Sequence, residues 1–165
     1  MSTTVSNPYS FNISKNTEFS SSIQVILPNE SQSLFSDSDT GLAGCVAVSI
    51  QKDIELKIPN GVNVIFVDAN ANATTKYPDS FNEGGISITN IENNKIWASQ
   101  RDSITGHFFD LSVHKYIGVT PDKIYKLKIN ICWSFAGVDP GHSSVRLDIY
   151  YSALINQQNP DILDY

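Results

Sequence analysis

The clearest pattern in the chain is a strict alternation of apolar and polar residues near the C-terminal end. Apolar side chains occupy every second position over 125–133 and again over 145–151. A period of two is that of a β-strand with one buried and one free face. The segment 135–144 between them is rich in Gly, Asp and Pro, which favour turns. The pattern therefore predicts a β-hairpin with a long loop, and it places Arg146 and Asp148 on the face away from the core.

Shorter strands are predicted along the rest of the chain by the same reasoning. The Asn60-Gly61 pair is a strong short hairpin signal, and the polar segments 29–41 and 68–85 are expected to be loops. No stretch keeps a helical period of 3.6 residues over three turns. The remaining predicted strands are 22–28, 42–50, 53–59, 62–67, 86–91, 95–99 and 107–113.

Short strands separated by turn signals, without helices, are typical of an all-β sandwich. We therefore expect an all-β fold of the jelly-roll β-sandwich type, and 165 residues suit one such domain. Residues 21–155 are assigned to the jelly roll. Residues 1–20 are expected to form a loose N-terminal arm or an edge strand, and 156–165 a polar C-terminal tail.

The charge balance argues against two classes of partner. The chain has only 11 Lys and Arg residues and a formal net charge of −6, whereas phosphate backbones and anionic membranes attract clustered cations. No run of 18 apolar residues is present, so membrane insertion is not expected. Residues 1–15 lack the basic and apolar regions of a secretory signal. We expect a soluble chain made in the cytoplasm, with leaderless release left open and its final location unknown.

The sequence contains none of the common catalytic or metal-binding motifs. The three histidines lie in different segments, and no CxxC or HxxxH spacing occurs. Cys45 and Cys132 each lie in an apolar run, which favours buried thiols; a disulfide requires the two strands to lie within bridging distance. We therefore expect neither an enzyme nor a metal or other cofactor. What remains is a surface rich in Tyr, Asn, Ser, Thr, Asp and Arg, which suits sugar recognition.

Four short segments form a further pattern. They are the Gly-initiated apolar strand 61–67, the Tyr-loop-Gly-Ile segment 77–86, the Thr-Gly-His-Phe stretch 105–108, and 133–152, in which a Trp precedes a Gly-containing loop and Leu-Asp-Ile-Tyr. Together they resemble the TNF-like fucose-binding lectin domain at the N-terminus of a bacterial two-domain superlectin. The resemblance covers about Gly61–Leu154. It implies a jelly roll that forms a homotrimer and binds glycans, including fucosylated ones, between neighbouring protomers.

The resemblance also implies a set of sugar contacts. This chain has His107 where the family has an arginine after Thr-Gly, so that Arg101 or Arg146 is expected to supply the missing guanidinium. It also has Ile149 where the family has a serine after the final aspartate. The implied carbohydrate-binding residues are Tyr77, Ser87, Arg101, Thr105, His107, Arg146 and Asp148.

Three other functions fit the sequence. A structural or assembly jelly roll, such as a capsid, fibre-head or appendage component, predicts the same fold without a sugar site. A membrane-damaging β-sandwich toxin is a third reading, although no amphipathic membrane segment favours it. A glycoside hydrolase with paired carboxylates comes last, because no Asp or Glu lies in an apolar setting that would raise its pKa.

Overall fold

The computed structural model describes residues 31–41, 48–136 and 141–152, with backbone only at 135 and 136. All regular structure in these ranges is β, and they contain no helix that could span a membrane. The eight strands are β1 (Ser31–Gly41), β2 (Val48–Lys57), β3 (Val64–Thr74), β4 (Phe81–Asn90), β5 (Ile96–Thr105), β6 (Phe108–Gly118), β7 (Ile124–Ala136) and β8 (His142–Ser152).

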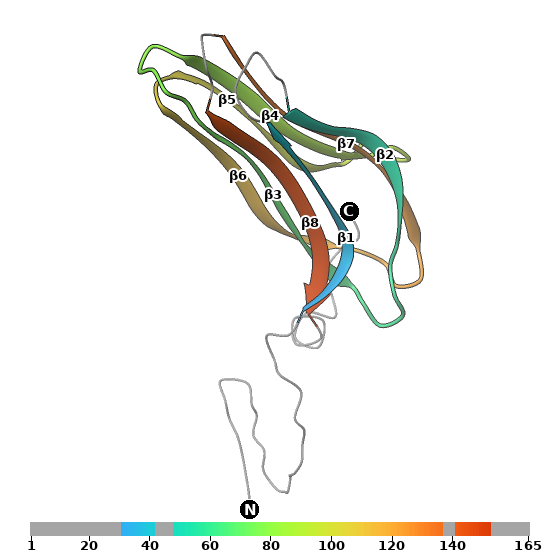
Figure 1. The fold of residues 1–165 in the computed structure, drawn as a ribbon. Coiled ribbons are helices and arrows are strands. Elements are labelled where there is room, and N and C mark those ends of the chain that lie inside the picture. The colour runs from blue at the N-terminus through green and yellow to red at the C-terminus, as the bar shows by residue number, and fades with distance from the viewer. Residues whose placement is uncertain (1–30, 42–47, 137–140, 153–165) are drawn as a thin grey trace, which may run out of the picture. The chain divides into compact units, whose positions relative to one another are not determined.

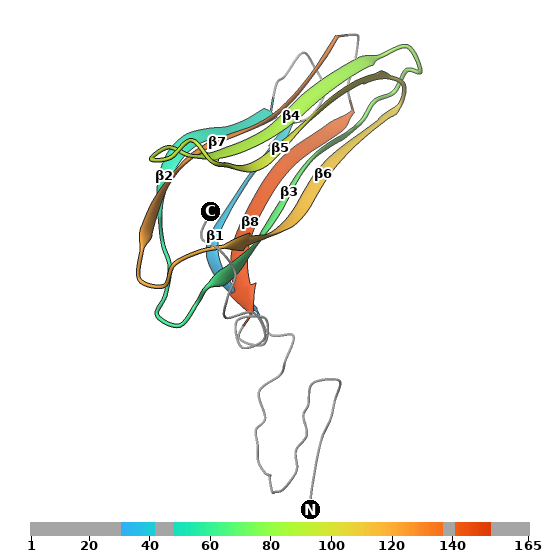
Figure 2. The same cartoon turned by 180° about the vertical axis from the view of Figure 1, so that it is seen from behind.

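The strands form two antiparallel four-stranded sheets that pack face to face (Figures 1 and 2). Sheet A has the order β1-β8-β3-β6, and sheet B has the order β2-β7-β4-β5. Successive strands alternate between the two sheets, except for β4 and β5, which are neighbours in sheet B. This is the double Greek-key arrangement of an eight-stranded jelly roll, so the predicted all-β jelly-roll sandwich is confirmed.

The core lies between the sheets and is built by the inward positions of both. The alternation predicted for β7 and β8 is confirmed, because Leu127, Ile129, Ile131, Leu147 and Ile149 are at most 1% exposed. Two tryptophans and a tyrosine add the largest buried volume, as expected for side chains that each bury a large area. The largest fully buried residues of sheet B are Trp97, Trp133 and Tyr125.

The hairpin predicted over 125–154 is wrong. β7 pairs with β2 and β4 in sheet B, whereas β8 pairs with β1 and β3 in sheet A. The turn at Asn60-Gly61 is present, with Gly61 at a φ of 81° that suits glycine, but it too joins strands of different sheets. Alternation identifies the buried face of a strand, and it does not identify the strand beside it.

Two segments predicted as loops are largely strand. β3 continues to Thr74 because Ala69, Ala71 and Ala73 keep the inward alternation with side chains too small to read as a core pattern. Within 29–41, the described residues form β1, an edge strand rich in Ser and Asp that pairs with β8 over its whole length. Edge strands tolerate polar side chains on both faces, which removes the apolar signal.

Several expectations lie outside the described residues. They concern the arm at 1–20, the tail at 156–165, the strand at 22–28 and Cys45. Cys132 is a free thiol on the outer face of sheet B, half-buried between Ser49 and Gly85 in register, so its predicted place in the core is wrong.

Candidate functional site

The outer face of sheet B carries a shallow, open hollow of about 350 Å³ at the β4–β5 hairpin. Four of its lining residues are outward residues of the hairpin and bring one aromatic ring, one carboxylate, one guanidinium and one hydroxyl, whereas Asp102 lies opposite the inward Gly84 in register. The lining residues, which we call the β4–β5 hollow, are Phe81, Glu83, Arg101, Asp102 and Ser103.

The hairpin register positions these side chains. Phe81 lies opposite Thr105, Glu83 opposite Ser103, and Gly85 opposite Arg101, so outward residues of both strands form one surface. A Cβ at position 85 would stand 3.6 Å from Arg101 Cγ, which places the arginine stem directly over that glycine. The absence of a side chain at Gly85 therefore leaves room for the Arg101 stem beside the hollow.

The hollow contains both signs of charge. Arg101 Nη2 lies 3.5 Å from Glu83 Oε2, and the Arg101 side chain is 80% exposed. Asp102 Oδ1 accepts a hydrogen bond of 2.8 Å from the backbone N–H of Ser103, which orients its carboxylate. Phe81 is 40% exposed, so part of its ring is open to solvent. The arrangement offers hydrogen-bond donors, acceptors and an aromatic ring to one small ligand.

A buried polar network fixes the end of the sandwich beside the hollow. Asn82, which is fully buried, accepts a hydrogen bond from Trp133 Nε1 at 3.1 Å and donates one to Gly106 O at 3.1 Å. Thr75 Oγ1 also donates to Gly106 O, at 2.9 Å. Gly106 has a φ of 154°, a conformation that disfavours a side chain. The Gly106 carbonyl thus anchors the end of β5 to the core.

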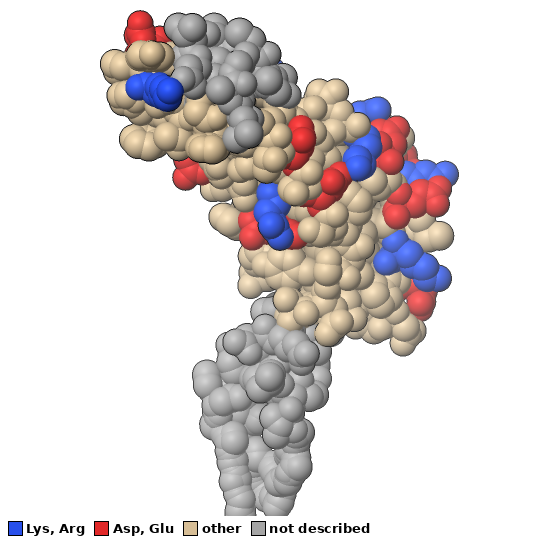
Figure 3. All heavy atoms as spheres, viewed as in Figure 1, with Lys and Arg blue, Asp and Glu red and all other residues tan. Residues whose placement is uncertain are grey.

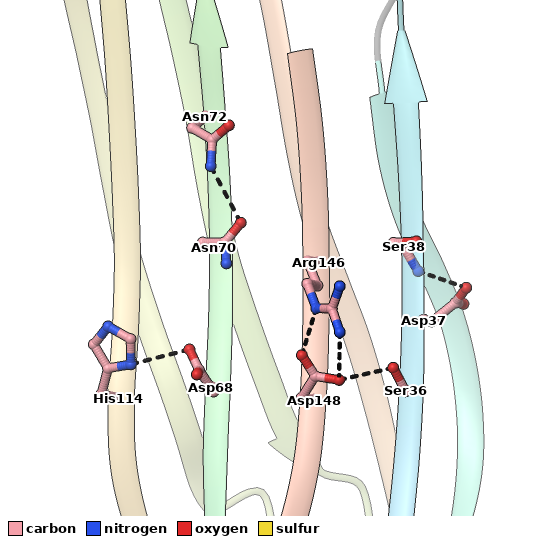
Figure 4. Close-up of polar contacts among 9 residues, drawn as sticks. All are labelled: Ser36, Asp37, Ser38, Asp68, Asn70, Asn72, His114, Arg146 and Asp148. Atoms are coloured by element: carbon pink, nitrogen blue, oxygen red, sulfur yellow. Dashed lines mark hydrogen bonds and ion pairs between the residues drawn. The ribbon is translucent and has the colours of Figure 1, made fainter.

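A second polar cluster covers the outer face of sheet A (Figure 4). Asp148 accepts hydrogen bonds from Arg146 Nε at 2.6 Å, from Arg146 Nη2 at 3.3 Å and from Ser36 Oγ at 2.7 Å. His114 Nδ1 lies 2.9 Å from Asp68 Oδ1 on the neighbouring strands. Asp68 and Asp148 are opposite each other in register, so two like charges lie side by side, each with its own partner.

The surroundings of this cluster shift three pKa values. Hydrogen bonding to Arg146, with a further contribution from Ser36, holds the pKa of Asp148 below its usual value. The same contact raises the pKa of Arg146. Burial, followed by the nearby Asp68 and Asp148 carboxylates, raises the pKa of Tyr150. The carboxylate of Asp148 is therefore stabilised in its charged form by groups of its own chain.

An aromatic row runs beside this cluster on the same face. The Phe66 ring lies 4.8 Å from that of Tyr116, edge to face, and 5.0 Å from that of Tyr150. All three are outward residues of neighbouring strands, and Tyr116 is 53% exposed. We call this set the sheet A aromatic row.

The seven expected sugar-binding residues fall into three groups. Ser87, Arg101 and Thr105 share the outer face of β4–β5 with the hollow, and Arg101 lines it. Tyr77 and His107 lie at the adjoining end, where His107 Nδ1 is 3.1 Å from Thr75 O and Tyr77 is 47% exposed. Arg146 and Asp148 lie on the opposite outer face, in sheet A. One protomer does not bring all seven together.

The site residues expected from the sequence did not include Phe81, Glu83, Asp102 and Ser103. The first two fell in the segment read as a loop. An available signal was the alternation of Asn82, Gly84, Ile86 and Ile88, which are the buried positions of β4. It was obscured because two of those four residues are Asn and Gly.

Charges of opposite sign are interspersed on the molecule. Figure 3 shows most Lys and Arg groups of the viewed face next to Asp or Glu groups. Examples are Lys128 with Asp53, at 3.3 Å, and Lys52 with Asp37. Within the ranges that the structure covers, no group of three or more His, Cys, Asp or Glu residues is placed to hold a metal ion.

No protein-family model matches the chain. No curated protein sequence matches it either. Among solved structures, it is similar to those titled infectious bursal disease virus Gx strain (TM-score 0.36) and Gt strain (TM-score 0.31), each at 12% identity over 74% of this chain. A mutant VP2 protein of the same virus, from derived T=1 particles, has a TM-score of 0.33 at 12% identity over 76%. The chain spans 32% of each of these proteins, and scores this low carry no argument about function.

Proposed function

We propose that this chain is a carbohydrate-binding domain, a lectin without catalytic activity, and that it binds glycans in the β4–β5 hollow. The observation that carries the proposal is the position of Phe81 beside Glu83, Arg101 and Asp102 in one open depression. Sugars are recognised by an aromatic ring against their apolar face and by planar hydrogen-bonding groups at their hydroxyls. The hollow offers both within the reach of one or two saccharide rings.

Each lining residue has a role in this proposal. Phe81 packs against the C–H groups of the ring, Arg101 donates to hydroxyl oxygens, and Glu83 accepts from hydroxyl groups. Thr105 and Ser87 extend the polar surface along the same face. Because the depression is shallow and open, one site encloses little of its ligand and binds weakly. Several sites on one assembly would raise the overall affinity.

We propose that copies of the chain associate through the outer face of sheet A, in the trimer that the lectin resemblance implies. The polar groups around Asp148 already bond one another, so burying them leaves few unmet hydrogen bonds. Exposed aromatic residues such as Tyr116 are enriched in protein interfaces. Arg146 and Asp148 then belong to the boundary between protomers, whereas the proposed sugar site lies on sheet B, away from that boundary.

The test is a glycan array probed with the purified chain, followed by titration of the saccharides that bind. Phe81→Ala and Arg101→Ala should each weaken binding at least several-fold. Ile96→Ala and Lys126→Ala are the matched controls, because Ile96 is exposed and Lys126 is an outward cation on sheet B away from the hollow. A folded chain that binds no glycan on the array would refute the proposal.

The sheet A aromatic row also favours a structural or assembly protein, because that function requires a self-association surface and no sugar site. The two functions predict different results in the same experiment. A structural jelly roll would assemble normally and give no glycan signal, and the variants of the hollow would leave its behaviour unchanged.

A further inference from the structure

His114 lies next to the sheet A aromatic row, on the face through which copies of the chain are proposed to associate. Its ring Nδ1 is 2.9 Å from Asp68 Oδ1, and its side chain is 59% exposed. Residues two apart on a strand point to the same side, so Tyr116 of the row is the outward neighbour of His114 along β6. An interface of the usual size, about 800 Å² on each partner, that is built on Tyr116 therefore also covers His114 and Asp68.

The charged groups that share this face with His114 are mostly carboxylates. Asp68 on β3 is opposite His114, and Asp148 on β8 is opposite Asp68 and is bonded to Arg146. On β6 itself, the next outward charge is that of Asp110. β1 contributes hydroxyl groups, and β5, which contacts β6 from the other sheet, meets its inner side. Among the described residues, the outer face of sheet A therefore carries three carboxylates and one guanidinium.

A proton on His114 changes this balance. Imidazole ordinarily gains its proton near pH 6.5, whereas the phenols of Tyr116 and Tyr150 are uncharged near neutral pH. The cation of Lys115 belongs to the residue that points to the other side of β6, opposite Val67 in register. A neutral His114 can still donate to Asp68, but only an imidazolium cancels the charge of that carboxylate. Burying an uncompensated carboxylate between protomers is costly, so assembly favours the protonated ring.

We infer that association through the outer face of sheet A takes up a proton at His114, so that copies of the chain assemble more tightly as the pH falls from 8 to 6. This inference rests on the proposed association through that face. A group that holds its proton more tightly in the assembly stabilises the assembly at low pH, and this contribution is lost as the pH rises. The carboxylate of Asp148 is already compensated by Arg146, which leaves the pair of His114 and Asp68 as the part of the cluster that responds to pH.

The experiment measures self-association of the full chain by analytical ultracentrifugation at pH 6, 7 and 8 and constant ionic strength. The concentration at which half of the protein is assembled should rise about 3- to 10-fold from pH 6 to pH 8. His114→Gln keeps a hydrogen-bond donor but cannot titrate, so its response should be less than half that of the wild type. His142→Gln is the matched control, because His142 is an outward residue of the same face six positions from Asp148, or about 20 Å along β8. It should keep the full response.

The outcomes separate this inference from the proposed association. Equal responses of the wild type and His114→Gln overturn the inference and leave the association standing, and so does a wild-type response that is absent or reversed. The same follows if His142→Gln removes the response as fully as His114→Gln does. Asp68→Asn is a second test, because without the carboxylate the response should also fall, and a full response in this variant overturns the inference. A chain that stays monomeric at all three pH values overturns both proposals. Matching melting curves at each pH establish that the variants are folded.

Discussion

Arg146 donates two hydrogen bonds to Asp148, which lies two residues further along the same strand: Nε to Oδ2 at 2.6 Å and Nη2 to Oδ1 at 3.3 Å. Residues i and i+2 of a strand point to the same side, so β8 itself supplies both halves of the pair. Ser36 of β1 completes the contact at 2.7 Å. Asp148 thus connects the edge strand β1 to β8 through Ser36. Its oxygens already accept hydrogen bonds from Arg146 and Ser36, which a ligand of Asp148 would have to replace.

This pair should make the protein sensitive to acid. Because the pKa of Asp148 is lowered in the folded state, its carboxylate contributes stability above its ordinary pKa of about 3.9. That contribution is lost as the pH falls from there through the lower folded-state pKa. Asp37, whose pKa is lowered chiefly by its hydrogen bond to Lys52, acts in the same direction. In urea unfolding between pH 2 and 7, the free energy of unfolding should fall more steeply towards acid pH for the wild type than for Asp148→Asn.

Asp79→Asn serves as the control for charge, since Asp79 lies in the exposed β3–β4 connection. It should retain the steep decline of the wild type below pH 4. An Asp148→Asn curve that parallels the wild type over the whole range would show that the Arg146 contact has no part in stability.

Gly84 should not tolerate a side chain. A Cβ there would lie 2.9 Å from the Phe109 ring and 2.9 Å from the Cys132 carbonyl oxygen, which is closer than such contacts allow. Gly84→Ala should lower the free energy of unfolding by about 1–3 kcal/mol, because the ring from sheet A must shift. Chemical denaturation measures this loss.

Gly85→Ala is the paired control, because its Cβ would meet nothing closer than 3.6 Å. Its unfolding free energy should stay within about 0.5 kcal/mol of the wild type, as for a tolerated surface substitution. Equal losses for the two variants would mean that backbone effects, and not the approach of Phe109, set the cost at Gly84.

These contrasts indicate what the sequence could and could not predict. The period of two identified the inward residues of β7 and β8, because large apolar side chains mark them. The same period failed for β3, where Ala69, Ala71 and Ala73 face the core, and for the start of β4, where Asn82 and Gly84 do. Small and polar residues are buried there for reasons of fit and hydrogen bonding that only the tertiary structure supplies: Phe109 of the opposite sheet lies against Gly84, and Asn82 bonds Trp133 of the same sheet.

The site was predicted in part for a related reason. Arg101 and its neighbours Ser87 and Thr105 were identified through resemblance, and they share one face because β4 and β5 form the hairpin. Glu83, Asp102 and Ser103 carry no distinctive local pattern. Glu83 and Ser103 become part of a candidate site only when the register places them on one face with Phe81. Strand pairing was the missing information in both cases.

Asn82 should matter for stability although it is polar. Asn82→Ala removes the acceptor for Trp133 Nε1 and a donor to Gly106 O, both in the interior. Loss of such a buried bridge should cost about 1–3 kcal/mol. Urea unfolding followed by tryptophan fluorescence would measure it. Asn130→Ala, at an exposed outward position of β7, should cost little. A small loss at Asn82 would mean that water replaces the amide.

Tyr116 should be needed for assembly and dispensable for folding. Its ring is 53% exposed, so Tyr116→Ala removes little buried area within one protomer while it disrupts the sheet A aromatic row. Analytical ultracentrifugation should show a shift from trimer to smaller species. The dissociated Tyr116→Ala protomer should melt at the same temperature as the dissociated wild-type protomer. Ile124→Ala, at 45% exposure on sheet B, should leave assembly intact. A Tyr116→Ala variant that remains fully assembled would exclude the row as the contact.

The alternation of strands between sheets also bears on how the chain reaches its fold. Among the eight strands described, β4 and β5 alone are both consecutive and paired. Every other pairing joins strands that are not consecutive in the chain, and such closures slow folding. The β4–β5 hairpin is therefore the segment best able to form early. The surface proposed to bind glycans would then take shape before the sheet proposed to join the protomers, so that binding and assembly become separable in time.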